Sequence, residues 1–540
     1  MSVSREEYRW VVWFGVVVML ITMLPYVAAY AAQGEEWTFT GFIIGVEDGN
    51  SYIAKMLAGY GGDWLFRTAY TTFPQRGLFV YLPFILLGKL TAPPAQHEQM
   101  VALFHLFRFI AGVLLCLAVY DFISLFIQQW HLRRWGLALA ILGGGLGWLL
   151  ILCGQGGLYG SLPLDLYSPE SFGFLMLFSI PHLTLARAFL LWGFVRYLSQ
   201  QPEAVSIQHI FRFSSTGAAT GVLWFCTSIF QPLTVLIGWG LLLFHILVLG
   251  ISVWRDKKSM KMNIWWGYIR QAGWAVLFSS PLVLYTAAAF SFDPYAKIWA
   301  TQNQLPSPHP LHYILAYGLV LPLVVYGAVQ IIRKERWRGW LPVSWVMVFP
   351  FWVYASVSIQ RRLAEGVWVA MSVLVMAAIE KWRKGQRKAY QPVWLSITFF
   401  TTMFLLVGSM QAAVNLRMPI FRPAQETQFF KAVRSQVEDG SVVLASFNTS
   451  NSLPAWAPVR VVIGHGPESV AVEENTQVAE AFYRVDTDDS ARQKLLYEQG
   501  IDYVIFGPEE ARLGEWFPIN DAYLTFIFGM EDYYLFKVRE

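Results

Sequence analysis

Residues 42–56 read FIIGVEDGNSYIAKM and directly follow the first long apolar run of the chain. Two adjacent acids, Glu47 and Asp48, precede a Gly-Asn pair that can form a turn. The following segment, YIAKMLAGYGG, can run as a short helix on a membrane surface. Carboxylates just beyond an apolar segment have two explanations: they take part in chemistry, or they are solvated acids of an external loop. The rest of the sequence has to decide between them.

Composition places the chain among membrane proteins. Of its 540 residues, 56% are hydrophobic and only 14% are charged, whereas soluble domains have roughly 25% charged residues. The 24 Trp and 40 Phe residues are typical of aromatic belts at two membrane surfaces. A net charge of +4 is too small to indicate a nucleic-acid partner. The three cysteines lack the spacing of a metal or redox motif, and we interpret them as small apolar residues.

Apolar runs long enough to cross a bilayer, about 20 residues each, recur along the first 414 residues. The first run is longer than the apolar core of a signal peptide and further runs follow it, so we expect it to be a span. The sequence predicts about eleven transmembrane helices: 9–31, 100–127, 135–153, 176–198, 214–231, 233–253, 268–290, 311–332, 340–357, 363–380 and 393–413.

Basic segments orient these spans, because cytoplasmic loops are enriched in Lys and Arg. The strongest basic segments are 131–134, 255–258, 333–336 and 381–384. Eleven spans place all four on the cytoplasmic side, together with the amino terminus, in the plasma membrane. The run 77–92 is short and contains Pro83, and counting it as a span would move 131–134 outside. We therefore expect 77–92 to lie along or dip into the outer surface.

The external segments follow from this topology. Residues 32–99 form one long external loop with juxtamembrane helices, and the loops 154–175, 291–310 and 358–362 are external as well. From about residue 420 the chain changes character, with short predicted strands and two amphipathic helices, the second ending at Gly500. We expect residues 1–414 to form the membrane domain and residues 415–540 a small extracytoplasmic α/β domain. This domain has no phosphate loop, GxSxG or metal triad, so we interpret it as a lid or recognition module.

Cationic and polar residues gather at the predicted external ends of the spans. Two arginines in Gln360-Arg361-Arg362 run against the usual charge bias of external loops, and arginine forks suit phosphate oxygens. Anchoring to lipid head groups is the alternative. Charges at membrane depth usually face a cavity. Further candidates for substrate contacts are Arg67 in the first external loop, His105 and Arg108 in span two, His182 in span four, and His309 before span eight.

Together these residues predict a polar cavity that opens outward, with acids on one wall and cations on another. Asp48 or Glu47 could take a proton from an acceptor hydroxyl. Arg361 and Arg362 could hold a departing phosphate and stabilise its charge.

Several stretches resemble the GT-C superfamily of membrane glycosyltransferases, which includes protein O-mannosyltransferases and the aminoarabinose transferase of lipid A. TTFPQRGLFVYLPFILLGKL (71–90) and LFHLFRFIAGVLL (103–115) are similar to its proline-led surface helix and Arg-containing second span. Five further stretches resemble features that recur in a broad set of bacterial membrane proteins with this layout. They are EDGNSYIAKM, IPHLTLARAFLL, LPSPHPLHYILAYGL, SIQRRLAEG and IDYVIFGPEEARLG.

The resemblance implies transfer of a sugar from a polyprenyl-phosphate-linked donor at the outer face. The catalytic acid would be Asp48 or Glu47, and the donor-phosphate cations would be Arg361 and Arg362. The family often has a second acidic site, for which Asp165 and Glu170 are only loose counterparts. No cofactor is therefore certain: Mg²⁺ or Mn²⁺ is possible, but two carboxylates alone make a poor cage for either ion.

Three functions remain open. The first is an inverting glycosyltransferase with a lipid, glycan or protein acceptor. The second is a transporter or flippase of a lipid-linked or small polar substrate, which the absence of a convincing internal repeat and the external position of the polar residues disfavour. The third is a binding or structural membrane protein whose tail recruits a partner.

Overall fold

The computed structural model describes residues 3–255, 262–334, 337–385, 393–514, 516–518 and 521–539. The basic residues Lys257, Lys258 and Arg336 of the predicted cytoplasmic segments lie outside these ranges. Contacts divide the chain into two compact units, which are described separately below. Unit 1 consists of Met1–Met23, Phe107–Ala287 and Gln304–Gly408, and unit 2 of Leu24–Leu106, Ala288–Asn303 and Ser409–Glu540. The sequence-based domain boundary at 414/415 stays a prediction.

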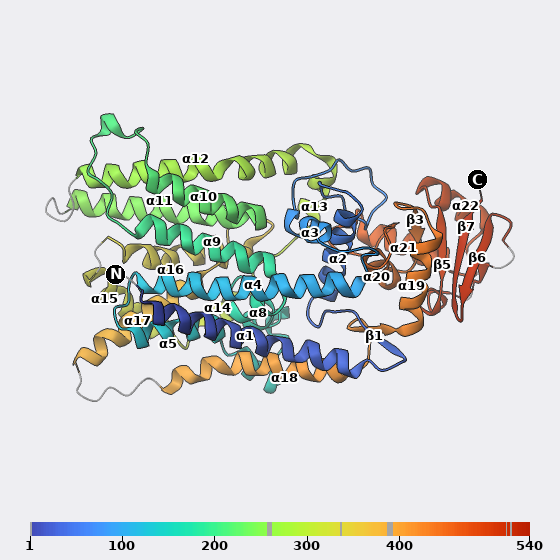
Figure 1. Ribbon diagram of the computed structural model, residues 1–540, viewed down its shortest axis with the longest axis horizontal. Coiled ribbons are helices and arrows are strands. Elements are labelled where there is room, and N and C mark those ends of the chain that lie inside the picture. The colour runs from blue at the N-terminus through green and yellow to red at the C-terminus, as the bar shows by residue number, and fades with distance from the viewer. Residues whose placement is uncertain are drawn as a thin grey trace. The chain divides into compact units, whose positions relative to one another are not determined.

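The protein is a helical membrane protein, as its composition indicates (Figure 1). Among the described residues, six helical segments are long and apolar enough to cross a membrane, and a seventh is added if α14 (Pro310–Tyr317) and α15 (Leu321–Lys334), bent by 73°, form one span. The six segments correspond to α1 (Arg5–Ala32), α4 (His97–Ser124), α11 (Pro232–Arg255), α12 (Met262–Phe292), α17 (Val367–Gly385) and α18 (Phe400–Val414).

The other predicted spans coincide with helices that are shorter or interrupted, so the count of eleven stays a prediction. In the run 135–153, the break falls at Gly143–Gly145, where Gly144 donates its N–H to Thr398 O at 2.7 Å. Neighbouring backbone thus satisfies the non-helical segment, as burial in an apolar setting requires. The shorter helices are α5 (Trp130–Leu142), α6 (Gly147–Leu152), α8 (Gly173–Ser179), α9 (Pro181–Leu198), α10 (Ser215–Phe230) and α16 (Trp340–Trp352).

The run 77–92 does not form a helix long enough to cross a membrane, and its position at the outer surface stays a prediction. It contains α3 (Leu82–Lys89), whose eight residues extend only about 12 Å. This helix packs closely on α2 (Val46–Tyr60), the helix that carries the two acids. A Cβ at Gly88 would lie 1.8 Å from Met56 O, and a Cβ at Gly59 would lie 2.1 Å from Ile85 O. Glycine at both positions is therefore required for the contact that seats α2.

Unit 2 contains the sheet that the carboxy-terminal sequence predicts. Its order is β4-β3-β5-β7-β6, with β3 parallel to β4 and β5, and β7 antiparallel to β5 and β6 (Figure 1). The strands are β3 (Val442–Leu444), β4 (Arg460–Val461), β5 (Tyr503–Phe506), β6 (Leu524–Met530) and β7 (Tyr533–Val538). The accompanying helices are α19 (Ala424–Gln436), α20 (Phe447–Ser452), α21 (Val472–Phe482), α22 (Asp489–Glu498) and α23 (Pro508–Ala511). A separate antiparallel pair joins β1 (Trp37–Phe39) to β2 (Phe421–Pro423).

A buried ion pair in unit 1 joins Arg187 of α9 to Glu365, which lies two residues before α17. Arg187 also donates to the carbonyls of Pro169 at 3.0 Å and Glu170 at 2.8 Å. Trp345 donates its indole N–H to Glu365 O at 3.1 Å. One guanidinium therefore ties the loop before α8 to the segment that carries Arg361 and Arg362.

We expect Glu365→Ala to destabilise the protein strongly, because it leaves the Arg187 charge buried without its carboxylate. Removing one partner of a buried pair costs roughly 3–5 kcal/mol. Thermal unfolding of the purified protein should show a clearly lower Tm. The matched control is Arg484→Ala, which breaks an exposed pair with Asp486 and should leave Tm nearly unchanged. Equal Tm values for the two variants would contradict the structural role of the buried pair.

Candidate functional site

The acid pair lies in the first turn of α2. The chain enters this helix through Gly45, whose φ of 65° is left-handed and favours glycine. The helix N-terminus carries partial positive charge, which suits the adjacent carboxylates of Glu47 and Asp48. Both side chains are open to solvent, with exposed fractions of 46% and 61%. Gly49 packs against the ring of Phe42, where a Cβ would lie 2.3 Å away, and this fixes the opposite face of the helix.

A segment more than 400 residues later in the chain contacts both acids. Nε2 of His465 lies 3.3 Å from Oδ1 of Asp48, and Nδ1 lies 3.8 Å from Oε1 of Glu47. The Gly466 N–H donates to Oε1 of Glu47 at 2.6 Å. Unlike the acids, the His465 side chain is only 4% exposed. The carboxy-terminal part of the chain therefore contributes directly to the surroundings of the acid pair.

A buried network stands behind His465. Lys55 of α2 donates to Oε1 of Glu468 at 2.7 Å, and the Ser51 hydroxyl donates to the same oxygen at 2.7 Å. The Thr68 hydroxyl donates to Oε2 at 2.7 Å. Nζ of Lys55 also lies 4.4 Å from the centre of the Tyr81 ring, a cation–π distance. Lys55, Ser51, Thr68 and Glu468 are all buried, so the two charges are paired rather than solvated.

This network sets the protonation of the site. Burial alone would raise the pKa of Glu468, but the charges of Lys55 and His465 and the hydrogen bonds outweigh it and lower the pKa to about 2. Burial would lower the pKa of His465, yet the charge of Glu468 and the hydrogen bond and charge of Asp48 raise it. The protein atoms around its carboxylate would raise the pKa of Asp48, but the hydrogen bond and charge of His465 lower it. An ionised Asp48 beside a protonated His465 is therefore favoured.

The short helix α13 (Pro294–Gln302) holds the loop after His465. Gln302 donates to Ser469 O at 2.6 Å and accepts from the Ala471 N–H at 3.0 Å. The Tyr295 hydroxyl donates to Glu468 O at 3.1 Å. Three separate stretches of unit 2 thus meet behind the acid pair, and the predicted external loop 291–310 supplies one of them.

Two other candidates lie in unit 2 but make different contacts. Arg67 pairs with Asp63 at 3.4 Å, and its side chain is half exposed. His105 is buried, with Nε2 2.9 Å from Gly41 O and its ring 4.5 Å from that of Tyr26. Its contact with Gly41 supports the backbone that leads into α2. A substrate-binding role for either residue stays a prediction.

The predicted phosphate-binding residues lie in unit 1. Arg361 stacks on Tyr167, 4.5 Å from the ring centre, and forms no ion pair with a carboxylate in the part of the chain that the structure describes. Arg362 is 3.7 Å from Glu170, and Oε1 of Gln360 accepts from the Ser307 N–H at 3.0 Å. These residues therefore form a cationic segment in which the Arg361 guanidinium stacks on an aromatic face.

The remaining candidates of unit 1 serve several local contacts. Arg108 is buried and donates to the Thr22 hydroxyl at 2.9 Å and to the carbonyls of Leu177 and Phe178. His309 stacks on Tyr159 at 4.2 Å, and His182 is half-buried in the first turn of α9. The acids and the arginines belong to different units, so their predicted meeting in one cavity stays a prediction.

Two acids that could have formed a second acidic site are already engaged. Asp165 is buried and accepts from the N–H groups of Gly145 and Gly147 and from the Thr401 hydroxyl, all within 3.1 Å. Glu170 faces Arg362. Both carboxylates therefore stabilise unit 1 in the observed arrangement.

The acid pair does not form a metal-binding set as it is arranged. The ring nitrogens of His465 face the two carboxylates, and the Gly466 N–H occupies Oε1 of Glu47. Within the described ranges, no group of three His, Cys, Asp or Glu side chains is placed to hold a metal ion. The three residues fit a hydrogen-bonded cluster better than an Mg²⁺ or Mn²⁺ cage, and metal dependence stays a prediction.

The fold of the chain is similar to the folds of solved membrane glycosyltransferases. The apo oligosaccharyltransferase of Archaeoglobus fulgidus is similar with a TM-score of 0.52 and 11% identity over 97% of this chain and 74% of that one. The same enzyme in complex with Zn and sulfate gives a TM-score of 0.50 and 10% identity, over 96% and 72%. The arabinofuranosyltransferase AftD from Mycobacteria gives 0.51 and 13%, over 100% and 40%. Neither a family model nor a curated protein matches the sequence.

Sequence reasoning missed His465 and Glu468. The available signal was their position: His465-Gly466 ends RVVIGHG, an apolar stretch beginning with β4. Residues that follow the carboxyl end of a parallel strand often contact ligands. The partner of Glu468, Lys55, could not be inferred, because it lies 413 residues away.

We expect Glu468 to make the protein sensitive to acid. The pKa of this carboxyl is about 2 in the folded state, against an ordinary value of 4.5. The ionised Glu468 carboxylate therefore stabilises the fold fully at pH values above its ordinary pKa, and this stabilisation is lost as the pH falls toward 2. The Tm of the wild type should fall between about pH 5 and pH 2. Glu468→Gln should have a lower Tm at neutral pH and a flatter pH dependence in this window.

The control for this titration is Glu474→Gln, which changes an exposed acid in the first turn of α21. Its pH dependence of Tm should run parallel to that of the wild type. A Glu468→Gln curve that also runs parallel to the wild type would show that the ionised carboxylate does not stabilise the fold.

Proposed function

We propose that the protein is a membrane glycosyltransferase that moves a sugar from a polyprenyl-phosphate-linked donor to a lipid, glycan or protein acceptor at the outer face of the membrane. One observation carries the proposal: an exposed acid pair at the start of α2, fixed from behind by His465, in a chain with the fold of membrane glycosyltransferases. The fold alone would not assign a reaction, because one fold hosts many functions.

In this proposal Asp48 is the general base. His465 contacts one carboxylate oxygen of Asp48, and the Asp48 side chain is more than half exposed. The oxygen of the acceptor hydroxyl attacks the anomeric carbon and forms the new glycosidic bond. The proton of that hydroxyl passes to the Asp48 carboxylate. The bond between the anomeric carbon and the phosphate oxygen breaks, and polyprenyl phosphate leaves with the electron pair. The lowered pKa keeps Asp48 ionised before the reaction.

Arg361 and Arg362 would bind the donor phosphate. Arg361 lacks a carboxylate partner within the described residues, and its stacking on Tyr167 fixes the plane of the guanidinium. A guanidinium presents paired N–H donors that match phosphate oxygens. These donors would also stabilise the charge that develops on the departing phosphate. The proposal requires both groups of residues to act on the same donor molecule, and the two experiments below test this.

We expect both Asp48→Asn and Glu47→Gln to impair sugar transfer. Asp48→Asn, which lacks the proposed base, should reduce the rate by about 10²–10⁴-fold. Transfer is measured as release of polyprenyl phosphate from a polyprenyl-phosphate-linked sugar by the purified protein. The matched control is Glu35→Gln, which alters an exposed acid in a second adjacent pair, Glu35-Glu36, just after α1. Full activity in both test variants would leave the proposal without a base.

We expect Arg361→Ala to raise the KM for the donor by roughly 10–100-fold, the value of one or two charge-assisted hydrogen bonds. Arg361→Lys should recover part of this loss, because it keeps the charge but not the fork. Arg212→Ala removes an exposed arginine elsewhere in unit 1 and serves as the control. An unchanged donor KM in Arg361→Ala would exclude this residue from phosphate binding and favour its role as a head-group anchor.

A further inference from the structure

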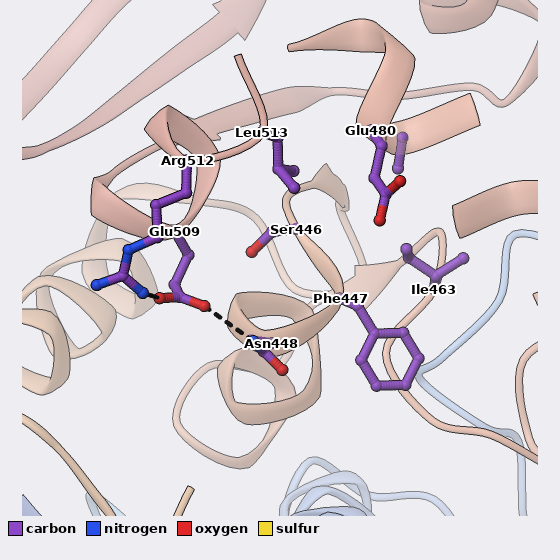
Figure 2. Close-up of a pocket in the computed structure, with 9 residues that line it drawn as sticks. Ser446, Phe447, Asn448, Ile463, Glu480, Glu509, Arg512 and Leu513 are labelled. Carbon is purple, nitrogen blue, oxygen red and sulfur yellow. Dashed lines mark hydrogen bonds and ion pairs between the residues drawn. The ribbon is translucent and has the colours of Figure 1, made fainter. Parts of the chain in front are cut away.

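The carboxy-terminal sheet has a cavity of its own, which the proposed reaction does not use. Its volume is about 260 Å³, and it is lined by residues that follow β3, by residues that follow β5, and by one face of α21 (Figure 2). Ser446, Phe447 and Asn448 come from the first group, and Glu509 and Arg512 from the second. All of these residues belong to unit 2.

The order of the strands explains why a cavity forms at this place. β3 lies between β4 and β5 and is parallel to both. The chain leaves β3 through α20 toward β4 on one side, then returns through α21 and α22 to β5 on the other side. The connections after neighbouring parallel strands therefore diverge at the carboxyl ends of β3 and β5. Open parallel sheets bind ligands at such switch points.

The polar groups of the cavity are arranged for hydrogen bonding. Asn448 donates its side-chain N–H to Oε2 of Glu509 at 2.8 Å, and Arg512 pairs with Oε1 of the same carboxylate (Figure 2). Glu480 of α21 lies across from this group, beyond Ser446, and its carboxylate has no hydrogen-bond or ion-pair partner among the described residues. The amide oxygen of Asn448 and the carboxylate of Glu480 therefore remain available as acceptors.

Apolar surface completes the cavity. Ile463, Ala479 and Leu513 line it between the polar groups, and Phe447 adds an aromatic ring. A site with a few placed polar groups on an apolar lining is typical of small-molecule recognition. Ring C–H groups of a ligand can pack on this surface while its hydroxyls reach the acceptors.

Charge and size narrow the ligand class. Two carboxylates and one guanidinium leave the lining with an excess of negative charge, which disfavours phosphates, nucleotides and other anions. α20 and α23, the helices after β3 and β5, have six and four residues, too few to offer an anion a developed helix dipole. The volume is below the roughly 300–1,000 Å³ of sites for drug-sized ligands. A small neutral ligand rich in hydroxyl donors fits these conditions.

From this geometry we infer that the cavity between the carboxyl ends of β3 and β5 is a carbohydrate subsite that takes one neutral sugar ring. Glu480 and Asn448 accept hydrogen bonds from ring hydroxyls, Glu509 holds the amide of Asn448 in place, and Phe447 and Leu513 contact the apolar edge of the ring. The inference stands independently of the transfer reaction, because none of these residues belongs to the acid pair or to the arginine segment.

The test is direct binding to the full-length protein in lipid nanodiscs, without sugar-based detergent. D-glucose, D-galactose, D-mannose, L-arabinose and N-acetyl-D-glucosamine are titrated separately and followed by saturation-transfer NMR. We expect saturable binding of at least one sugar with a Kd of about 1 mM, a reasonable affinity for a ligand of about a dozen heavy atoms. Glu480→Ala should weaken this binding at least about tenfold. The control, Glu473→Ala, changes an exposed acid at the other end of the same helix and should bind like the wild type.

Three results would overturn the inference. The first is no saturable binding of any of the five sugars up to roughly 50 mM by a protein whose thermal unfolding is normal. The second is equal binding by Glu480→Ala and Glu473→Ala, because the sugar would then sit elsewhere. The third is saturable binding of inorganic phosphate that Arg512→Ala removes, since the cavity would then be an anion site. A failure of sugar transfer in the acid-pair variants would not affect any of these outcomes.

Discussion

The buried ion pair between Lys55 and Glu468 is the interaction on which the candidate site depends. Both charges have left water, which is costly unless their hydrogen bonds are satisfied. Here Lys55, Ser51 and Thr68 supply three donors to the two carboxylate oxygens of Glu468. The pair joins α2 to the segment after β4 across 413 residues of sequence. His465 and Gly466 reach the acid pair because Glu468, only a few residues later, is held in this way.

The same pair explains the chemistry that the exposed acids can support. Two carboxylates in one helical turn repel each other and would be loosely oriented if water alone surrounded them. The negative charge of Glu468 favours a protonated His465, and that imidazolium in turn favours an ionised Asp48. Glu47 is fixed differently, by the Gly466 N–H. A buried salt bridge thus sets the charge of residues that it does not touch, through a histidine that is itself buried.

The sequence predicted what local patterns determine. Apolar length identified the helices, and short runs of apolar β-branched and aromatic residues identified strands such as β5 and β7, because both signals are contained within about 20 residues. The sequence also singled out Glu47 and Asp48 by their position after the first apolar run. It could not place His465 or Glu468, whose role depends on contacts that span most of the chain. A substrate contact by Arg108 stays a prediction, and its donors reach the Thr22 hydroxyl and the carbonyls of Leu177 and Phe178. A single sequence does not distinguish a buried cation that donates to backbone carbonyls from one that faces a cavity.

Helix α20 gives the carbohydrate cavity a physical link to the acid pair within unit 2. Asn448 of this helix lines the cavity, and Asn451, one turn later, donates to Gly464 O at 2.8 Å and accepts from Asn50 of α2 at 2.8 Å. Gly464 packs so closely on the backbone of α20 that a Cβ there would lie 2.7 Å from the carbonyl carbon of Ser450. Ile463 lines the cavity, and His465, two residues later, contacts Asp48. A sugar that orders Asn448 and Ile463 would therefore also restrain the backbone that positions His465. The factor by which this sugar raises the affinity for a substrate at the acid pair must equal the factor by which that substrate raises the affinity for the sugar.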